Sequence, residues 1–247
     1  MVVCAKGLRK VLRGNVILDD VSINVEAGTV TGIVGPSGAG KSTLLRIIAG
    51  IDAADEGSLA ISGFHYKFPC DPIRTNRPWP TVTLVFQGLC LWPHLTLRDN
   101  VMLPIGKEPG GPAVKCAIDF MARFGISELA SRFPNQVSGG QRQLFALCRA
   151  LALKPSVLLL DEVTAAIDVE HVRTLRQTIT NLRDEGTAVI LVSHSIPFVR
   201  RITDRVAFLD HGRLHEVGGV SILSSPTSPR LREFLIASDE LTEDETA

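Results

Sequence analysis

The sequence has little of several features that mark special classes of protein. Among 247 residues there are five cysteines and one tyrosine, and aromatic residues make up 5%. The cysteines are scattered and form no C-x-x-C pair, so neither a disulfide framework nor a zinc site is expected. We expect a reducing compartment such as the cytosol, with five free thiols: Cys4, Cys70, Cys90, Cys116 and Cys148.

An excess of charge and long apolar runs are also missing. Lys and Arg total 26, as do Asp and Glu, so no overall basic field attracts nucleic acid or anionic lipid, and no nucleic-acid partner is expected. No stretch approaches the roughly 20 apolar residues of a membrane span. The opening MVVCAKGLRK lacks an apolar signal core. We therefore expect a chain that neither crosses a membrane nor is exported.

What is present fits a globular α/β protein. Hydrophobic residues make up 45% and charged residues 21%, close to the average for soluble domains. Short, nearly all-apolar runs alternate with helix-like stretches, which is typical of strands buried on both faces of a sheet. Strands are expected over residues 16–25, 29–34, 58–62, 81–86, 157–160, 187–192 and 205–209, with helices over 41–49, 95–103, 113–124 and 141–153.

Three segments depart from this alternation. Residues 88–153 have no strong strand pattern, which predicts a helical insert. Residues 64–80 contain Pro69, Pro72, Pro78 and Pro80, which exclude regular helix and interior strand, so an irregular surface segment is expected there. The acidic, polar tail over 238–247 is expected to be frayed.

The most specific signal is a phosphate-binding loop. The pattern G-x-x-x-x-G-K-[ST] stands between an apolar run and a helical stretch. Its glycines let backbone N–H groups and a helix N-terminus point at phosphate oxygens, the lysine neutralises the β and γ phosphates, and the serine hydroxyl ligates magnesium. This predicts a nucleoside-triphosphate site formed by Gly35, Pro36, Ser37, Gly38, Ala39, Gly40, Lys41, Ser42 and Thr43.

Two acids and a glycine turn add to this site. Asp161 and Glu162 end an apolar run, where one acid can hold magnesium and the other can orient water. Without the phosphate loop, two solvated acids at a strand end would be an equally good interpretation of this pair. The turn Ser138, Gly139, Gly140 starts a predicted helix and offers N–H groups and a hydroxyl to an anion. The alternative interpretation is that Ser138 is an ordinary helix N-cap.

With these residues in place, the chain resembles the ATP-binding subunit of an ABC transporter over almost its whole length. The likeness lies in the content and the order of six motifs. They are the Walker A loop over 35–43, the Q-loop glutamine Gln87, the signature Ser138, Gly139, Gly140 and Gln141, Walker B over 158–162, the D-loop ending at Asp168, and the switch histidine His194.

The resemblance implies a fold and a division of the chain. It implies a P-loop NTPase core of the RecA-like type with a mainly parallel sheet, an antiparallel N-terminal β part and a helical insert subdomain. Residues 1–247 would then form a single ATPase domain, with the core over 1–87 and 154–237 and the helical signature subdomain over 88–153.

It also implies roles for residues. Ser42, Gln87 and Asp161 would hold Mg²⁺, Glu162 would polarise the attacking water, and His194 would reach the γ-phosphate of ATP. Two subunits, identical or paired, would face each other, so that the signature of one clasps ATP held by Lys41 of the other.

Several stretches resemble bacterial importers. They are residues 91–101, 134–136 and 229–235, the last being similar to the polar amino-acid uptake group. This implies an integral-membrane permease partner, an extracytoplasmic substrate-binding protein and a place on the cytoplasmic face of the cell membrane. Trp92 and His94 either meet the permease or belong to a capped surface loop with a buried Trp92. The alternatives are an export or non-transport complex acting on DNA or the ribosome, and a regulatory module that does not hydrolyse ATP.

A few positions depart from the family pattern. Leu12 stands where an aromatic residue usually stacks on adenine, which puts base selectivity in doubt. Val137, Val163 and Ala165 replace the usual leucine, proline and serine without removing a catalytic group.

Overall fold

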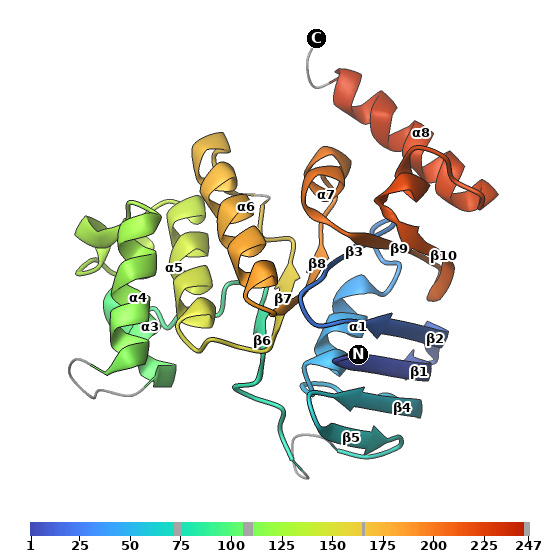
Figure 1. Cartoon of the computed structure of the whole chain (residues 1–247), viewed down its shortest axis with the longest axis horizontal. Coiled ribbons are helices and arrows are strands. Elements are labelled where there is room, and N and C mark those ends of the chain that lie inside the picture. Colours follow the sequence, from blue (N-terminus) through green and yellow to red (C-terminus); the bar gives the residue numbers. More distant parts are fainter. Residues whose placement is uncertain (72–75, 106–110, 165, 245–247) are drawn as a thin grey trace.

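The computed structural model describes residues 1–71, 76–105, 111–164 and 166–244, with side chains described as far as Ser238. Ala165 therefore lies outside the described residues. The described part contains two sheets and a group of helices (Figure 1). This confirms the predicted α/β class with a mainly parallel sheet, an antiparallel N-terminal part and a helical insert.

The core sheet has six strands in the order β10-β9-β3-β8-β7-β6. Neighbouring strands run parallel, except for the antiparallel pair β9 and β10. Every residue of β3, β7 and β8 is buried, as expected for apolar strands covered on both faces. The strands are β3 (Val30–Val34), β6 (Val82–Val85), β7 (Val157–Asp161), β8 (Ala188–Val192), β9 (Arg205–Asp210) and β10 (Arg213–Gly219).

The N-terminal sheet is antiparallel, with its four strands in the order β2-β1-β4-β5. Its strands are β1 (Val3–Leu12), β2 (Asn15–Val25), β4 (Glu56–Ile61) and β5 (Phe64–Lys67). Strand β1 was not predicted, because its apolar residues are interrupted by Lys6, Arg9 and Lys10. The expectation of an irregular segment from residue 64 onward was wrong for residues 64–67, which pair with β4 ahead of the first proline, Pro69.

Helices lie on both sides of the core sheet, and α3, α4 and α5 gather beyond β6 (Figure 1). The helices are α1 (Lys41–Ile48), α3 (Leu97–Met102), α4 (Pro112–Arg123), α5 (Gly139–Leu151), α6 (Val169–Asp184), α7 (Ile196–Ile202) and α8 (Pro229–Asp244), with short 3₁₀ turns at Leu103–Ile105, Ser127–Leu129, Pro134–Gln136 and Val220–Leu223. The last helix continues through Asp244, so residues 238–244 of the acidic tail are helical, and residues 245–247 lie outside the described residues. No helix in the described ranges is long and apolar enough to span a membrane.

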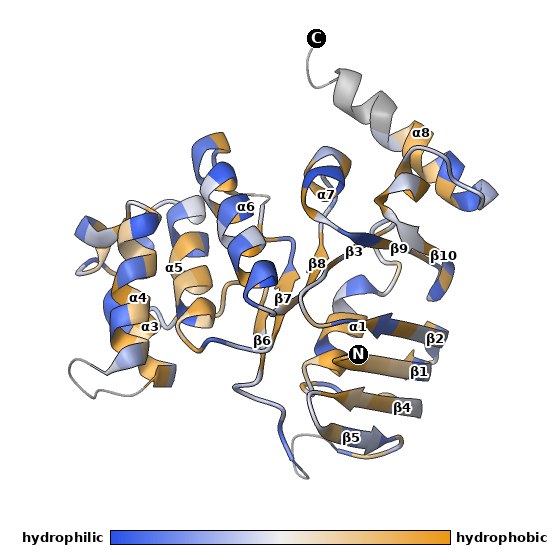
Figure 2. Ribbon diagram, in the orientation of Figure 1, coloured by the Kyte–Doolittle hydropathy of each residue, from blue (hydrophilic) through white to orange (hydrophobic). Residues whose placement is uncertain are grey.

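Alternate residues of the core strands feed two hydrophobic clusters. In β7, Leu158 and Leu160 pack with the apolar faces of α4 and α5, whereas Val157 and Leu159 pack with α1 and the N-terminal sheet. Figure 2 shows this arrangement as apolar colour on the central strands and on one side of the surrounding helices. The two clusters fix the sheet between the helical part and the N-terminal sheet, and hence fix the loops at the ends of its strands.

Candidate functional site

The strand register brings the predicted site residues to one edge of the core sheet. Ile33 of β3 and Asp161 of β7 both pair with Val192 of β8. The segments that follow these parallel strands therefore leave the sheet at the same level. They are the phosphate loop after β3, Glu162 after β7, His194 after β8 and Gln87 after β6.

The backbone of the phosphate loop requires glycine at particular points. Gly35 has a φ of 151°, and a Cβ there would lie 1.9 Å from the carbonyl oxygen of Leu209. Gly40 has a φ of 102°, and its Cβ would lie 2.7 Å from the carbonyl oxygen of Ile17. The loop is thus packed directly on the backbone of β9 and β2, which sets its curvature before any ligand binds.

Lys41 directs its charge into the curve of this loop. Its Nζ donates hydrogen bonds to the carbonyl oxygens of Gly35 and Pro36, each at 2.8 Å. Burial lowers the pKa of Lys41, while Glu162 and Asp161 raise it. The side chain is 5% exposed, so this cation is held inside the loop rather than in bulk solvent.

Asp161 lies beside the serine of the loop. The Ser42 hydroxyl donates to Asp161 Oδ1 at 3.1 Å. Burial raises the pKa of Asp161, the hydrogen bond from Ser42 lowers it, and Glu162 raises it. A hydroxyl and a carboxylate that meet in this way are the hard oxygen donors that Mg²⁺ prefers, so the donor set fits that metal.

Glu162 is held by the other two predicted residues. Gln87 Nε2 donates to its Oε2 at 2.7 Å, and His194 Nε2 lies 2.7 Å from its Oε1. The Glu162 N–H donates to the carbonyl of Val192 at 3.0 Å, and its φ is 52°, in the left-handed region. The carboxylate is therefore fixed in one orientation by side chains from two segments, and the backbone of Glu162 is fixed by β8.

One hollow of about 450 Å³ is lined by Lys41, Ser42, Gln87, Glu162 and His194. Its lining also includes Leu12 and Ile17 from the N-terminal sheet. The structure thus brings together the loop residues 37–43 with Gln87, Glu162 and His194. Neither the signature residues 138–141 nor Asp168 is among the residues that line this hollow.

The signature turn caps helix α5. The Gln141 N–H donates to Ser138 Oγ at 3.2 Å, and the Ser138 N–H donates to Gln141 Oε1 at 3.0 Å, which forms a reciprocal capping box. A Cβ at Gly140 would lie 2.3 Å from the carbonyl oxygen of Ala166. The start of α5 therefore packs on the segment that leads to Asp168.

Asp168 caps helix α6, and it has a partner that the sequence did not reveal. The backbone N–H of His171 donates to Asp168 Oδ1 at 3.0 Å, and the His171 ring also contacts this carboxylate. The i, i+3 spacing of an N-cap aspartate and a histidine was the available signal. The His171 ring also contacts the carbonyl oxygen of Phe124 at the end of α4. This contact joins distant parts of the chain, so no local sequence signal predicted it.

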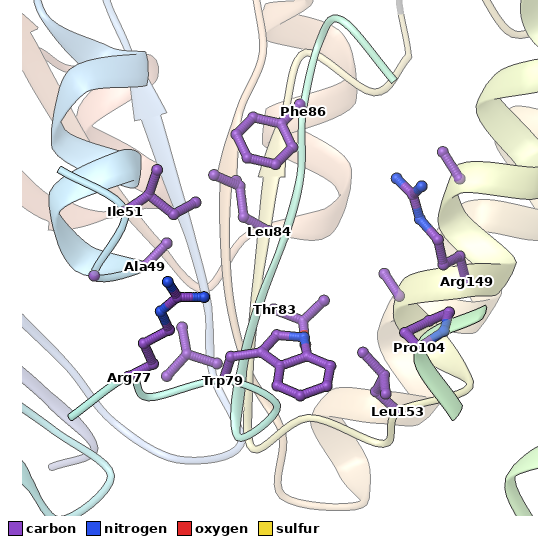
Figure 3. Close-up of a pocket in the computed structure, with 14 residues that line it drawn as sticks. Ala49, Ile51, Arg77, Trp79, Thr83, Leu84, Phe86, Pro104, Arg149 and Leu153 are labelled. Atoms are coloured by element: carbon purple, nitrogen blue, oxygen red, sulfur yellow. The ribbon is translucent and has the colours of Figure 1, made fainter. Parts of the chain in front are cut away.

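A second hollow, of about 360 Å³, lies between α1, β6 and α5 (Figure 3). Its lining is mostly apolar, and the proline-rich segment supplies Arg77 and Trp79 to it. Trp79 is 52% exposed, and Phe86, adjacent to Gln87, lines the same hollow. Trp92 is 51% exposed and meets His94 edge to face at 5.7 Å, so the alternative of a buried Trp92 was wrong.

Comparison with known proteins identifies related sequences. A family model described as "ABC transporter" matches residues 18–165. The glutamine transport ATP-binding protein GlnQ of Escherichia coli is 38% identical over 223 residues, covering 89% of this chain and 92% of GlnQ. The glutamate transport ATP-binding protein GluA of Corynebacterium efficiens is 36% identical, covering 93% of this chain and 96% of GluA. The sulfate/thiosulfate import ATP-binding protein CysA of Mycobacterium bovis is 40% identical, covering 92% of this chain and 64% of CysA.

A solved structure agrees with the fold. It is a dimeric ATP-binding cassette in a post-hydrolysis state, bound to ADP and Pi. It superposes with a TM-score of 0.79 at 30% identity, covering 88% of this chain and 98% of that one.

Proposed function

Because this chain belongs to the ABC transporter family and is one of its ATPases, we propose that it hydrolyses MgATP through the residues gathered at the phosphate loop and uses this reaction to drive solute import through a separate permease. The observation that carries the proposal is the fixed Glu162 carboxylate at the mouth of the loop. Gln87 and His194 both contact it at 2.7 Å.

The loop accounts for binding of the triphosphate. Backbone N–H groups of residues 37–43, including the start of α1, would surround the phosphate oxygens, with Lys41 supplying the positive charge. Ser42, Asp161 and the side-chain oxygen of Gln87 would hold Mg²⁺, which neutralises phosphate charge when bound. Leu12 lines the same hollow and would lie against the base.

Glu162 is the residue placed to handle the attacking water. A carboxylate held at two oxygens can orient a water molecule and accept its hydrogen bond without first reorganising. Phosphoryl transfer depends mainly on such positioning and on charge stabilisation. His194, 46% exposed beyond its contact with Glu162, would complete the site at the γ-phosphate.

The signature residues would act on a second chain. Residues 138–141 do not line the hollow of their own chain, so an anion at the start of α5 would be one held by another subunit. A Cβ at Gly140 would lie 2.3 Å from the carbonyl oxygen of Ala166, so Asp168, two residues later, would belong to the same surface as the signature. We therefore propose a homodimer or a pair of related cassettes, each a single domain with the helical part over residues 88–153.

The second hollow suits the permease. Its lining is mostly apolar, and it lies between the end of α1, the strand that leads to Gln87, and α5 (Figure 3). A permease segment seated there would contact three elements that carry nucleotide-binding motifs at their ends, which couples transport to hydrolysis. The chain would then lie on the cytoplasmic face of the membrane.

Amino acids are the substrate class that we propose. GlnQ and GluA carry glutamine and glutamate transport in their names, and both match along nearly their whole length. An importer of this kind would also work with an extracytoplasmic substrate-binding protein. Uptake of radiolabelled glutamine, glutamate and sulfate by cells with and without this chain distinguishes amino-acid import from sulfate import. Unchanged uptake of all three compounds contradicts both.

The hydrolytic role is tested by Glu162→Gln. The amide keeps the size of the side chain but accepts fewer hydrogen bonds from water, so hydrolysis should fall by at least about 100-fold while ATP still binds. The ATP-bound chain should then elute as a dimer in size-exclusion chromatography. Lys41→Ala is the matched control, because it should lose nucleotide binding and stay monomeric. Near-normal turnover in Glu162→Gln would exclude Glu162 as the water-orienting residue.

A further inference from the structure

His171 makes contacts that the proposed hydrolysis does not use. Its ring Nδ1 lies 2.7 Å from Oδ1 and 2.8 Å from Oδ2 of Asp168. On the opposite side of the ring, Nε2 lies 3.1 Å from the carbonyl oxygen of Phe124. Phe124 is the residue that follows α4, so the ring bridges the start of α6 and the end of α4.

Both contacts of the ring are made to acceptors. A carboxylate and a carbonyl oxygen have no proton to donate, so each ring nitrogen needs its own N–H for both bonds to form. Neutral imidazole has one N–H, whereas imidazolium has two. The bridge is therefore complete only in the imidazolium form, in which the bond to Asp168 is also charge-assisted.

Asp168 is the charged group that the ring of His171 contacts. Hydrogen bonds from the backbone N–H and the ring of His171 hold the pKa of Asp168 below its usual range, so Asp168 stays ionised at neutral pH. On α4, Arg123 lies over the ring of Phe120, 5.4 Å from its centroid. On α6, Glu170 and Arg173 line a different hollow, next to α7.

The exposures of the two side chains show how the bridge is oriented. The side chain of Asp168 is 67% exposed, whereas that of His171 is 28% exposed. The more buried ring thus contacts the carboxylate on its protein side, and the carboxylate remains exposed to solvent. Because α4 packs on α5, the bridge also connects Asp168 to the helix that Ser138 caps.

We infer that His171 is a positioning residue: its imidazolium fixes the Asp168 carboxylate and couples it to the helical part, so that Asp168 and the signature move together toward the partner chain. This inference rests on the proposed function, in which one chain completes the site of the other. It gives turnover a dependence on pH that comes from a residue outside the nucleotide hollow.

The experiment compares ATPase kinetics of wild type, His171→Ala and His171→Arg from about pH 6 to about pH 8.5, which spans the ordinary titration of histidine. At the acid end, kcat of His171→Ala should be about tenfold below wild type, because a displaced carboxylate loses alignment. The ATP affinity of the single chain should stay unchanged. As the pH rises, wild type should lose the bridge and approach His171→Ala. Arginine keeps its charge and two donors, so His171→Arg should retain activity at every pH.

Controls separate this inference from folding and from the proposed function. His65→Gln, an exposed histidine on β5, should follow the wild-type profile. If wild type hydrolyses ATP and His171→Ala matches its kcat at every pH, the positioning role is overturned while the proposed function stands. If wild type hydrolyses nothing, the proposed function fails, and ¹⁵N NMR of the ring still tests the bridge. Two protonated ring nitrogens at about pH 6 that respond to Asp168→Asn support it, and no response overturns it.

Discussion

At the scale of single residues, the proposed function puts Leu12 against the base of the nucleotide. It is 45% exposed and lines the nucleotide hollow, where it offers an aliphatic edge instead of a ring. Stacking of a base on an aromatic side chain is worth about 1 to 3 kcal/mol. Leu12→Tyr should therefore tighten ATP binding several-fold, measured by titration with a fluorescent ATP analogue and competition by ATP and GTP. Unchanged or weaker affinity would mean that Leu12 does not face the base.

Adjacent glycines in the signature give a matched pair of substitutions. A Cβ at Gly140 would lie 2.3 Å from a backbone oxygen of residue 166, whereas at Gly139 the nearest atoms lie at 3.9 Å. Gly140→Ala should therefore destabilise the chain by about 1 to 3 kcal/mol because backbone must move, and Gly139→Ala should stay close to wild type. Urea unfolding measures both, and equal stabilities would contradict the observed packing of α5 on residue 166.

The structure brings predicted site residues together where the sequence signal is local. The phosphate loop and the pair Asp161 and Glu162 are contiguous, and Gln87 and His194 follow apolar strands whose order the fold class fixes. His171 could not be predicted, because its partner at Phe124 is distant in the chain. Trp79 could not be placed either, since prolines indicate an irregular backbone but not the hollow that it lines.

At the scale of elements, one ion pair joins α8 to β9, beside the apolar contacts of Leu231, Phe234 and Leu235 with the core. Asp210 ends β9 with its side chain 3% exposed, and it accepts hydrogen bonds from Arg230 Nε at 3.0 Å and Nη2 at 2.6 Å. Removing the arginine leaves a buried carboxylate without its cation.

Arg230→Ala should therefore lower the free energy of unfolding, because the Asp210 carboxylate is then buried without its guanidinium partner. In thermal unfolding this corresponds to a Tm lower by about 2 to 4 °C per kcal/mol for a chain of this size. Glu233→Ala is the control: this residue pairs with the same arginine but is 65% exposed, and its loss should change little. Equal Tm values for both variants would show that the buried pair does not hold α8.

The elements that sequence patterns identified are those whose pattern follows from burial. Strands β3, β7 and β8 are buried at every residue and read as apolar runs. Strand β10 alternates between exposed and half-buried residues, and Arg213 and Glu216 within it obscure the pattern. Helix α6 has three buried residues in sixteen, so most of its sequence is polar and carries a weak periodic signal.

At the scale of the whole molecule, two chains build each site in the proposed function. Each chain carries the phosphate loop in one hollow and the signature on a surface outside that hollow. A chain with Lys41→Ala loses the first face, and one with Ser138→Arg loses the second. Either change in both chains of a dimer therefore removes one face of both sites and should abolish hydrolysis.

The most direct measurement compares two heterodimers, each isolated through different affinity tags on its two chains. In one heterodimer, a single chain carries both Lys41→Ala and Ser138→Arg, so each site has one defective face. In the other, the two changes lie on different chains, so one site has two defective faces and the other has none. We expect ATP hydrolysis by the second heterodimer and almost none by the first. Equal rates in the two heterodimers would contradict a site shared between chains.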